Sequence, residues 1–325
     1  MHPHSASDHF ARRALVNYIR TAQRAASEVI RTYSTSFFAA THLLGRRNRQ
    51  HVRNLYALVR VADELVDGVS AAVGLTRDAQ LAALNQFETA TLTAMRTGYS
   101  TDLVIQAFAH TARTANISAD LVLPFFAAMR TDLLEVPGRP GSDADRVPTA
   151  GGGDPATAGV RTYDGAAHAQ YVYGSAEVVG LMCLRIFLRG QPVDAKDRSQ
   201  METGARQLGA ALQNINFLRD FSEDTARLGR HYLGTVSELT PDIKARWVAV
   251  AQEQLDDAQA ALPLLPSDAR RAVCGVHGLF SELLARIAAA ECEELHRRRI
   301  RVPDSRKARI LGQALLSDSG RKWAK

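Results

Sequence analysis

The chain has 325 residues, a mass of 35.4 kDa and a formal net charge of +6, and 46% of its residues are hydrophobic. This much apolar material is enough for a large core, which excludes a disordered or fibrous protein. Its three cysteines, Cys183, Cys274 and Cys292, are too few and too scattered for a disulfide framework or a zinc cluster, so we expect a reduced, cytoplasmic compartment.

Partners and membranes are constrained by the distribution of charge and apolar residues. Acidic and basic residues interleave along the whole chain, without a nucleic-acid-binding motif, so we expect no nucleic-acid partner. The N-terminus lacks the apolar stretch of a secretory signal, and the apolar run at 178–184 is far shorter than the roughly 20 residues that cross a bilayer. The sequence predicts a soluble protein that contacts a membrane at most peripherally.

The spacing of apolar residues is helical nearly throughout the chain, which predicts an all-α protein. The helices are expected at 8–31, 47–70, 76–97, 100–115, 118–134, 163–189, 195–225, 241–262, 267–299 and 304–317. Residues 136–160 interrupt this pattern with six Gly and four Pro, which predicts a flexible surface loop. Because helices on both sides of the loop carry the motifs described below, we expect one domain over residues 1–325.

The first motif in chain order is Tyr33-Ser-Thr-Ser-Phe37. The hydroxyls of Ser34 and Ser36 can hydrogen-bond phosphate oxygens, or they can cap the start of a helix. This motif alone does not separate the two possibilities.

A polar row follows on the next predicted helix. Tyr56, Arg60, Asp63 and Asp67 are spaced by four, three and four residues, which places them on one helix face beside an apolar stripe. Asp63 and Asp67 lie one turn apart, so their carboxylates can share divalent cations, and such hard oxygen ligands suit Mg²⁺. The alternative is a solvated acidic face in which Arg60 forms a helix ion pair.

A third motif, Tyr171-Val-Tyr-Gly-Ser-Ala-Glu-Val-Val-Gly180, combines tyrosines with small residues. The small residues let helices or a ligand approach closely. Tyr171 offers a hydroxyl or a π-face to a developing carbocation. Ordinary tight helix packing explains the motif equally well.

A second polar row contains Gln213, Asn216, Asp220 and Asp224, spaced by three, four and four residues. One amide oxygen and two carboxylates in a row form a set of hard metal ligands. Two such rows could face each other across a cavity, where Mg²⁺ and a diphosphate would remove the repulsion between their carboxylates.

Together these motifs resemble the squalene/phytoene synthase family over about residues 25–315, with bacterial and especially actinobacterial phytoene synthases as the most similar branch. The resemblance is carried by Y-S-T-S-F at 33–37, L-Y-A-L-V-R-V-A-D-E-L-V-D at 55–67, Y-V-Y-G-S-A-E-V-V-G at 171–180, L-Q-N-I-N-F-L-R-D-F-S-E-D at 212–224, G-R-H-Y-L at 229–233 and the basic stretch at 297–307. Three positions depart from the family pattern: Thr35 replaces a frequent Lys, Glu177 a usual Gly and Phe280 a common Tyr.

The resemblance implies an all-α isoprenoid-synthase fold with a central active-site cavity. It implies Mg²⁺, with Mn²⁺ as an alternative, and no nicotinamide cofactor. The implied metal ligands are Asp63, Asp67, Asn216, Asp220 and Asp224, and the four aspartates and Tyr171, which would lie near the reacting carbons, are the implied catalytic residues. The implied contacts to diphosphate or its metal shell are Ser34, Ser36, Tyr56, Arg60, Gln213, Arg219, Arg230 and Tyr232.

The implied activity is the head-to-head condensation of two geranylgeranyl diphosphates, through a cyclopropylcarbinyl (prephytoene) diphosphate, to phytoene in carotenoid biosynthesis. One alternative is a C30 enzyme that uses farnesyl diphosphate and makes dehydrosqualene or squalene. A lower-ranked alternative is a non-catalytic helical assembly factor of the same fold. The presence of all four aspartates disfavours the last alternative.

Overall fold

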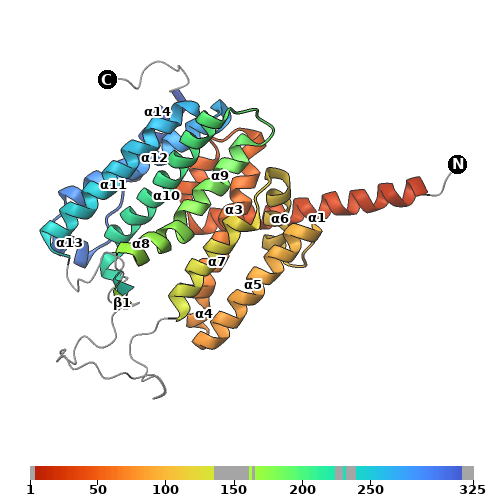
Figure 1. Ribbon diagram of the computed structural model, residues 1–325, viewed down its shortest axis with the longest axis horizontal. Coiled ribbons are helices and arrows are strands. Elements are labelled where there is room, and N and C mark those ends of the chain that lie inside the picture. The colour runs from red at the N-terminus through yellow and green to blue at the C-terminus, as the bar shows by residue number, and fades with distance from the viewer. Residues whose placement is uncertain (1–3, 135–160, 163–164, 224–229, 232–238, 317–325) are drawn as a thin grey trace.

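The computed structural model describes residues 4–134, 161–162, 165–223, 230–231 and 239–316, and they form a bundle of helices (Figure 1). The α-helices are α1 His4–Tyr33, α2 Thr35–Thr41, α3 Arg46–Asp67, α4 Val69–Ala72, α5 Arg77–Thr97, α6 Leu103–Ala115, α7 Ala119–Leu134, α8 Gly165–Val172, α9 Val178–Leu188, α10 Ala195–Glu223, α11 Pro241–Ala261, α12 Ser267–Ala289, α13 Cys292–Arg297 and α14 Asp304–Leu316. A π-helix, η2 Tyr173–Glu177, joins α8 to α9, and a short 3-10 helix, η4 Leu262–Leu264, follows α11. The described strands are β1 Arg161–Thr162 and β2 Arg230–His231, which pair in parallel. The all-α prediction is therefore confirmed.

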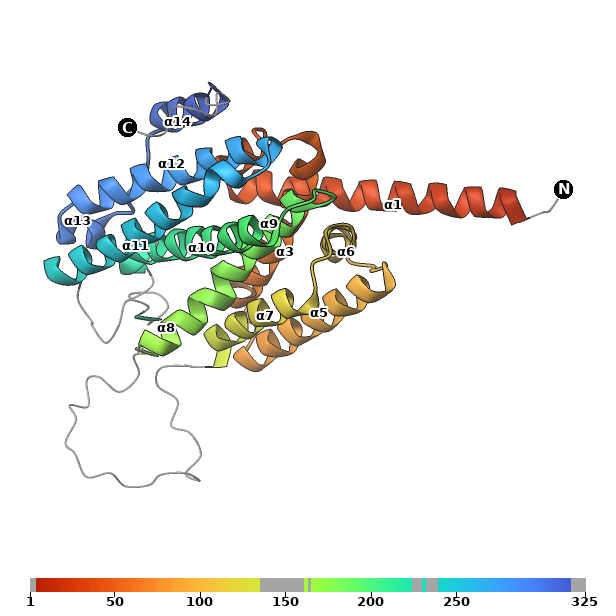
Figure 2. The ribbon, with the colours of Figure 1, turned by 45° about the horizontal axis from the view of Figure 1, so that its top comes forward.

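The core forms where helices from both halves of the chain meet. Helices α10, α11 and α12 pack side by side, while α3 packs against α1, α6, α7 and α9 (Figures 1 and 2). Helix α9 also packs against α10, so it lies between the two helices that carry the polar rows. These contacts join helices from both sides of the 136–160 stretch, which lies outside the described residues.

Helix α1 is packed only along part of its length. Its C-terminal half is buried at Ala22, Ala26 and Ile30, where it contacts α3 and α6. Its N-terminal half extends away from the bundle (Figure 2), and the described side chains from 9 to 17 are all exposed. The exposed half includes Phe10, at 77% exposure.

Several helix boundaries follow from local capping chemistry. Ser34 begins α2 by accepting a hydrogen bond from the Phe37 amide at 3.2 Å, and Thr240 begins α11 by accepting one from the Ile243 amide at 3.3 Å. The predicted helix at 267–299 was too long, because the backbone becomes extended at Ala290 before a new helix begins at Cys292. The predicted helix at 163–189 contains the π-helical turn η2 in its middle.

Glycines let the backbones of α7, η2, α9 and α10 approach closely. A Cβ atom at Gly174 would lie 2.5 Å from the Pro124 carbonyl oxygen of α7, and one at Gly209 would lie 2.6 Å from the Ala176 carbonyl oxygen of η2. A Cβ atom at Gly180 would collide with the Ala205 carbonyl of α10. Gly174 and Gly180 of the 171–180 motif thus allow close helix packing, which is one of the two interpretations of this motif given by the sequence.

Two features bear on the compartment, the state of the cysteines and the most apolar helices. Cys183, Cys274 and Cys292 are all free thiols. Two stretches, Gly165–Leu188 and Ser267–Ala289, are long and apolar enough to cross a membrane by length and composition alone. The most apolar window is 56% buried within the protein in the first stretch and 33% buried in the second.

The close contact between α10 and η2 gives a stability prediction. Gly209→Ala places its methyl group against backbone atoms, which cannot rotate away, so we expect a loss of about 1–3 kcal/mol. Gly312→Ala on α14 is the matched control, since nothing lies within 4 Å of its added Cβ atom, and it should be neutral or slightly stabilising. Thermal unfolding followed by circular dichroism compares the two. Equal melting temperatures for both variants would contradict the close contact.

Candidate active site

The first polar row lies on α3 as the spacing predicted. Tyr56, Arg60, Asp63 and Asp67 are all half-buried. The apolar neighbours Leu55, Ala62 and Val66 are buried in the core. The amphipathic pattern therefore holds α3 in place through one face and presents the other face to a partly enclosed polar region.

Negative charge is concentrated around Asp63. The pKa of Asp63 is raised to about 7, mainly by burial and then by the carboxylates of Asp67, Asp132 and Glu64, while Arg60 opposes the shift. A carboxyl group crowded by three others is destabilised in its charged form. A bound cation would remove this destabilisation, so the charge pattern fits a site for a metal ion.

Arg60 is already engaged on its own helix. Its guanidinium pairs with Glu64 and stacks 4.4 Å from the centre of the Tyr33 ring. Its buried Nε has no hydrogen-bond partner among the described residues. The helix ion pair therefore forms, and one donor of the guanidinium is left for another acceptor.

The serine motif lies beside this row. A side-chain hydrogen bond with Ser34, together with the charge of Arg60, lowers the pKa of Tyr56, but burial has the larger effect and raises it. Ser34 also caps α2, while Ser36 is half-buried and Thr35 is exposed.

An aromatic cluster closes this side of the site. The Phe37 ring lies 6.1 Å from the Tyr56 ring and 6.0 Å from the Phe280 ring of α12. At position 280, where the family commonly has Tyr, this chain therefore uses ring packing.

The second polar row lies on α10. Gln213, Asn216 and Asp220 are half-buried, beside the fully buried Ile215. The Oδ1 atom of Asn216 is buried and has no hydrogen-bond partner among the described residues. An unpaired buried acceptor is costly, which is consistent with a ligand for a cation. Asp224 lies outside the described residues.

Asp220 is held by two arginines. Arg219 donates to it at 2.9 and 2.6 Å, and Arg299, from the segment between α13 and α14, lies 2.7 Å from its Oδ1 and donates to its Oδ2 at 2.9 Å. Arg299 was not among the predicted site residues. The only signal for it was the basic stretch at 297–307, which does not show which arginine turns inward.

Tyr171 is buried on α8, with 7% of its surface exposed. Its hydroxyl donates a hydrogen bond to Oδ2 of Asp132 on α7 at 2.7 Å, and its ring lies 6.1 Å from the Phe217 ring of α10. Asp132 is 2% exposed and was also missed from the sequence. The sequence feature that could have identified Asp132 is its position as a carboxylate within the mostly apolar helix at 119–134.

These contacts connect the two polar rows. The charge of Asp132 on α7 raises the pKa of Asp63 on α3, and its carboxylate accepts a hydrogen bond from Tyr171 of α8. The Tyr171 ring in turn lies 6.1 Å from the ring of Phe217, the neighbour of Asn216 on α10. The side chain of Arg230 and all of Tyr232 lie outside the described residues, although the Arg230 backbone pairs with Arg161 in the β1–β2 ladder.

Glu177, which replaces a usual glycine, is accommodated by its surroundings. It accepts a hydrogen bond at 2.6 Å from Arg206 of α10, and the Arg206 guanidinium lies 5.5 Å from the centre of the Tyr173 ring. The larger side chain thus faces an oppositely charged partner across the α10–η2 contact.

The residues present fit a divalent cation by their chemistry. Within the described part of the chain, no three His, Cys, Asp or Glu side chains gather in the geometry of a metal site. However, the carboxylates around Asp63 and the unpaired Oδ1 of Asn216 are hard oxygen donors of the kind that Mg²⁺ prefers.

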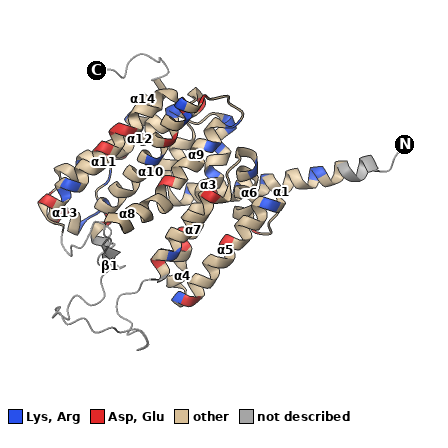
Figure 3. Cartoon of the chain, viewed as in Figure 1, with Lys and Arg blue, Asp and Glu red and all other residues tan. Residues whose placement is uncertain are grey.

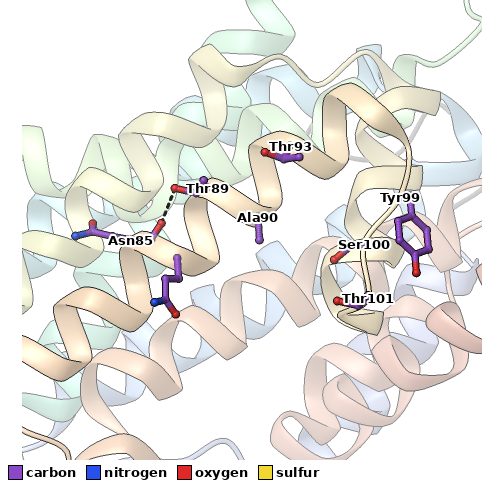
Figure 4. Close-up of a pocket in the computed structure, with 8 residues that line it drawn as sticks. Asn85, Thr89, Ala90, Thr93, Tyr99, Ser100 and Thr101 are labelled. Carbon is purple, nitrogen blue, oxygen red and sulfur yellow. Dashed lines mark hydrogen bonds between the residues drawn. The ribbon is translucent and has the colours of Figure 1, made fainter.

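Surface hollows do not explain the polar rows. One hollow, shown in Figure 4, lies along α5 and the segment after it and is lined by Asn85, Gln86, Thr89, Ala90, Thr93, Tyr99, Ser100 and Thr101. A second lies between the end of α5 and the start of α7. Neither contains a predicted site residue, and neither has a charged group that is buried.

A family comparison gives these features a common context. The model of the squalene/phytoene synthase family matches residues 30–237, which is more than half of the chain, and the chain belongs to this family. The match includes the serine motif, both polar rows and Tyr171.

Individual relatives agree with this assignment. The phytoene synthase of Mycobacterium tuberculosis is 28% identical over 92% of both chains, and the chloroplastic phytoene synthase 3 of Zea mays is 26% identical over 92% of this chain and 66% of the maize protein. The fold is similar to a dehydrosqualene synthase, with a TM-score of 0.68 and 20% identity over 92% of this chain and 97% of that one. It is also similar to the squalene synthase HpnC of Alicyclobacillus acidocaldarius, with a TM-score of 0.63 and 21% identity over 87% and 97%. The protein therefore has the isoprenoid-synthase fold of a prenyltransferase-type enzyme.

The raised pKa of Asp63 predicts a pH-dependent stability in the presence of EDTA. The folded pKa, about 7, lies above the ordinary value of 3.8, so the folded state loses stability as the pH rises from about 4 through 7. Asp63→Asn removes this penalty, so it should raise the melting temperature at pH 8 and raise it much less at pH 5.

Asp257→Asn, an exposed position on α11, is the matched control and should have little effect at either pH. An Asp63→Asn variant that is less stable than the wild type at pH 8, or that gains equally at both pH values, would rule out the raised pKa of Asp63.

Proposed function

We propose that this protein condenses two molecules of geranylgeranyl diphosphate head to head to phytoene, in carotenoid biosynthesis. The proposal is carried by the two polar rows on α3 and α10, connected through Asp132 and Tyr171. The phytoene synthase relatives, aligned over 92% of the chain, support the choice of substrate. By composition and fold we propose a cytoplasmic enzyme with one catalytic domain.

Asp63, Asp67, Asn216, Asp220 and Asp224 would hold Mg²⁺, or Mn²⁺ as an alternative. When bound, the metal would supply positive charge to the diphosphate groups. Arg219 and Arg299 reach the same region through Asp220, and the free Nε of Arg60 adds a further donor. The other groups proposed to contact diphosphate are Ser34, Ser36, Tyr56, Gln213, Arg230 and Tyr232.

The proposed reaction has two stages. In the first, the C1–O bond of one substrate breaks, the 2,3-double bond of the second attacks C1, and loss of a proton closes a cyclopropane ring, with release of one diphosphate. In the second stage, the cyclopropylcarbinyl diphosphate ionises, rearranges and loses a second proton to give phytoene. The atoms balance without a reductant, so we propose that no nicotinamide cofactor takes part.

This chain's own residues would stabilise the cation and protect it from water. The electron-rich ring and hydroxyl oxygen of Tyr171 favour a nearby positive charge. The walls beside it are apolar, since Phe217, Leu218 and Phe221 of α10 are at most 5% exposed. Excluding water prevents capture of the cation as an alcohol.

A C30 reaction with farnesyl diphosphate is the second candidate. It is favoured by one observation, the similarity of the fold to a dehydrosqualene synthase with a TM-score of 0.68. Both reactions use the same diphosphate chemistry, so only the length of the hydrocarbon tail separates them.

Product analysis tests the proposal directly. The protein is incubated with Mg²⁺ and an equal mixture of geranylgeranyl and farnesyl diphosphates, and the hydrocarbons are separated by chromatography. We expect mainly the C40 product. A C30 product in excess would support the second candidate, and no hydrocarbon from either substrate would refute an enzymatic role.

Asp63→Ala and Asp220→Ala should each lower kcat by about a hundredfold or more while the helical circular dichroism is kept. The loss of one metal ligand costs several kcal/mol of transition-state stabilisation, and each 1.36 kcal/mol corresponds to a factor of ten. Asp257→Ala, an exposed aspartate on α11, is the control and should keep full activity. Near-native activity of either site variant would disprove its metal assignment.

We also propose peripheral membrane contact through the exposed face of α1. Basic residues lie along α1 (Figure 3). Arg13, Arg20 and Arg24 are exposed, and their spacing of seven and four residues places them on one helix face. Phe10 and Val16, at 77% and 46% exposure, flank this face. A basic face with apolar flanks suits an anionic lipid surface, into which a C40 hydrocarbon would be released.

Sedimentation with lipid vesicles tests this contact. The wild type should bind phosphatidylcholine vesicles that contain phosphatidylglycerol, and binding should weaken several-fold in high salt. Replacing Arg13, Arg20 and Arg24 with Gln should abolish binding. The control carries the same loss of charge at the exposed Arg96, Arg246 and Arg309 and should still bind. Equal losses in both triple variants would show a nonspecific effect of net charge.

A further inference from the structure

The Asp132–Tyr171 hydrogen bond is the feature that the proposed reaction leaves unexplained. Its oxygen–oxygen distance is 2.7 Å, and its two residues are 2% and 7% exposed. A carboxylate this buried is costly, and it adds to the repulsion that raises the pKa of Asp63. A bundle that needed only packing at this position would be served better by an apolar residue.

Local packing fixes the geometry of this pair. Pro124, Ala128 and Asp132 are spaced by four residues and form one stripe on α7. Gly174 faces the first two, because a Cβ atom there would lie 2.5 Å from the Pro124 carbonyl oxygen and 2.8 Å from the Ala128 Cβ. Tyr171, one turn before Gly174, meets Asp132, one turn after Ala128. The glycine contact thus sets the separation of the two helices at which the hydrogen bond forms.

The direction of the hydrogen bond has a chemical consequence. The phenol donates to a carboxylate oxygen, so the hydroxyl hydrogen of Tyr171 points to Asp132. Toward any other group, the phenol oxygen then acts as an acceptor, and a charge-assisted hydrogen bond increases its electron density. An electron-rich oxygen and ring are what a developing carbocation requires, whereas a hydroxyl hydrogen pointing at the cation would repel it.

We propose that Asp132 is a positioning residue that orients the Tyr171 hydroxyl and acts on the reaction through it. The inference rests on the proposed function, since it assigns Asp132 a part in that reaction. It distinguishes Asp132 from the metal-binding carboxylates, which would act on the diphosphate groups.

A double-mutant cycle tests the proposal in the full-length protein, with the substrate that the wild type converts. Asp132→Asn keeps the shape of the side chain but allows its amide to donate. It should lower kcat by about ten- to a hundredfold and change KM and the Mg²⁺ concentration for half-maximal activity less than threefold. In a Tyr171→Phe background, Asp132→Asn should cause little further loss of kcat. Melting temperatures confirm that each variant folds.

Asp132→Glu separates positioning from charge. It keeps the negative charge but shifts the carboxylate by one methylene, so positioning predicts a loss of kcat similar to that of Asp132→Asn. Full activity of Asp132→Glu, independent losses in the double mutant, or a large shift in the Mg²⁺ requirement would each overturn the proposal. A wild type that converts neither prenyl diphosphate would instead refute the proposed function, so the two failures are distinct.

Discussion

A carboxylate that leaves water must find a cation, a hydrogen-bond donor or a proton, and this bundle brings several carboxylates into one partly buried region. Asp220 accepts hydrogen bonds from two arginines, and Asp132 accepts one from the Tyr171 hydroxyl. Burial, together with the nearby carboxylates of Asp67, Asp132 and Glu64, raises the pKa of Asp63 to about 7. The region around Asp63 therefore carries negative charge that its own side chains do not fully compensate. Such a region favours ligands that bring positive charge.

The arrangement of these carboxylates depends on close backbone packing. Gly174 admits the Pro124 carbonyl of α7, and Gly209 admits the Ala176 carbonyl of η2. Together they hold α7, η2 and α10 closer than alanine would permit. The π-helical turn at Tyr173–Glu177 lies at this junction, directly after the helix that carries Tyr171. The close packing of these helices thus determines which polar side chains come within hydrogen-bond distance, as Tyr171 and Asp132 do.

Spacing along one helix was enough to predict part of this site. The rows at 56–67 and 213–220 depend only on helical periodicity, so their half-buried faces follow from the sequence. Asp132 and Arg299 were missed because their roles depend on contacts with Tyr171 and Asp220, which are distant in the sequence. The break of the last long predicted helix at Ala290 was missed as well, since no glycine or proline marks it.

The two arginines on Asp220 show how a charged site can remain stable before its substrate binds. Arg219 and Arg299 neutralise the carboxylate directly, with donor–acceptor distances of 2.6–2.9 Å. In the proposed reaction a divalent cation and a diphosphate would bring a pair of opposite charges to this region. Asp220 would then hold the cation while Arg219 and Arg299 would hold the diphosphate, so that each charged side chain would exchange one partner for another of the same sign. Because neither side of this exchange leaves a buried charge without a partner, the cost of desolvation is met both before and after binding.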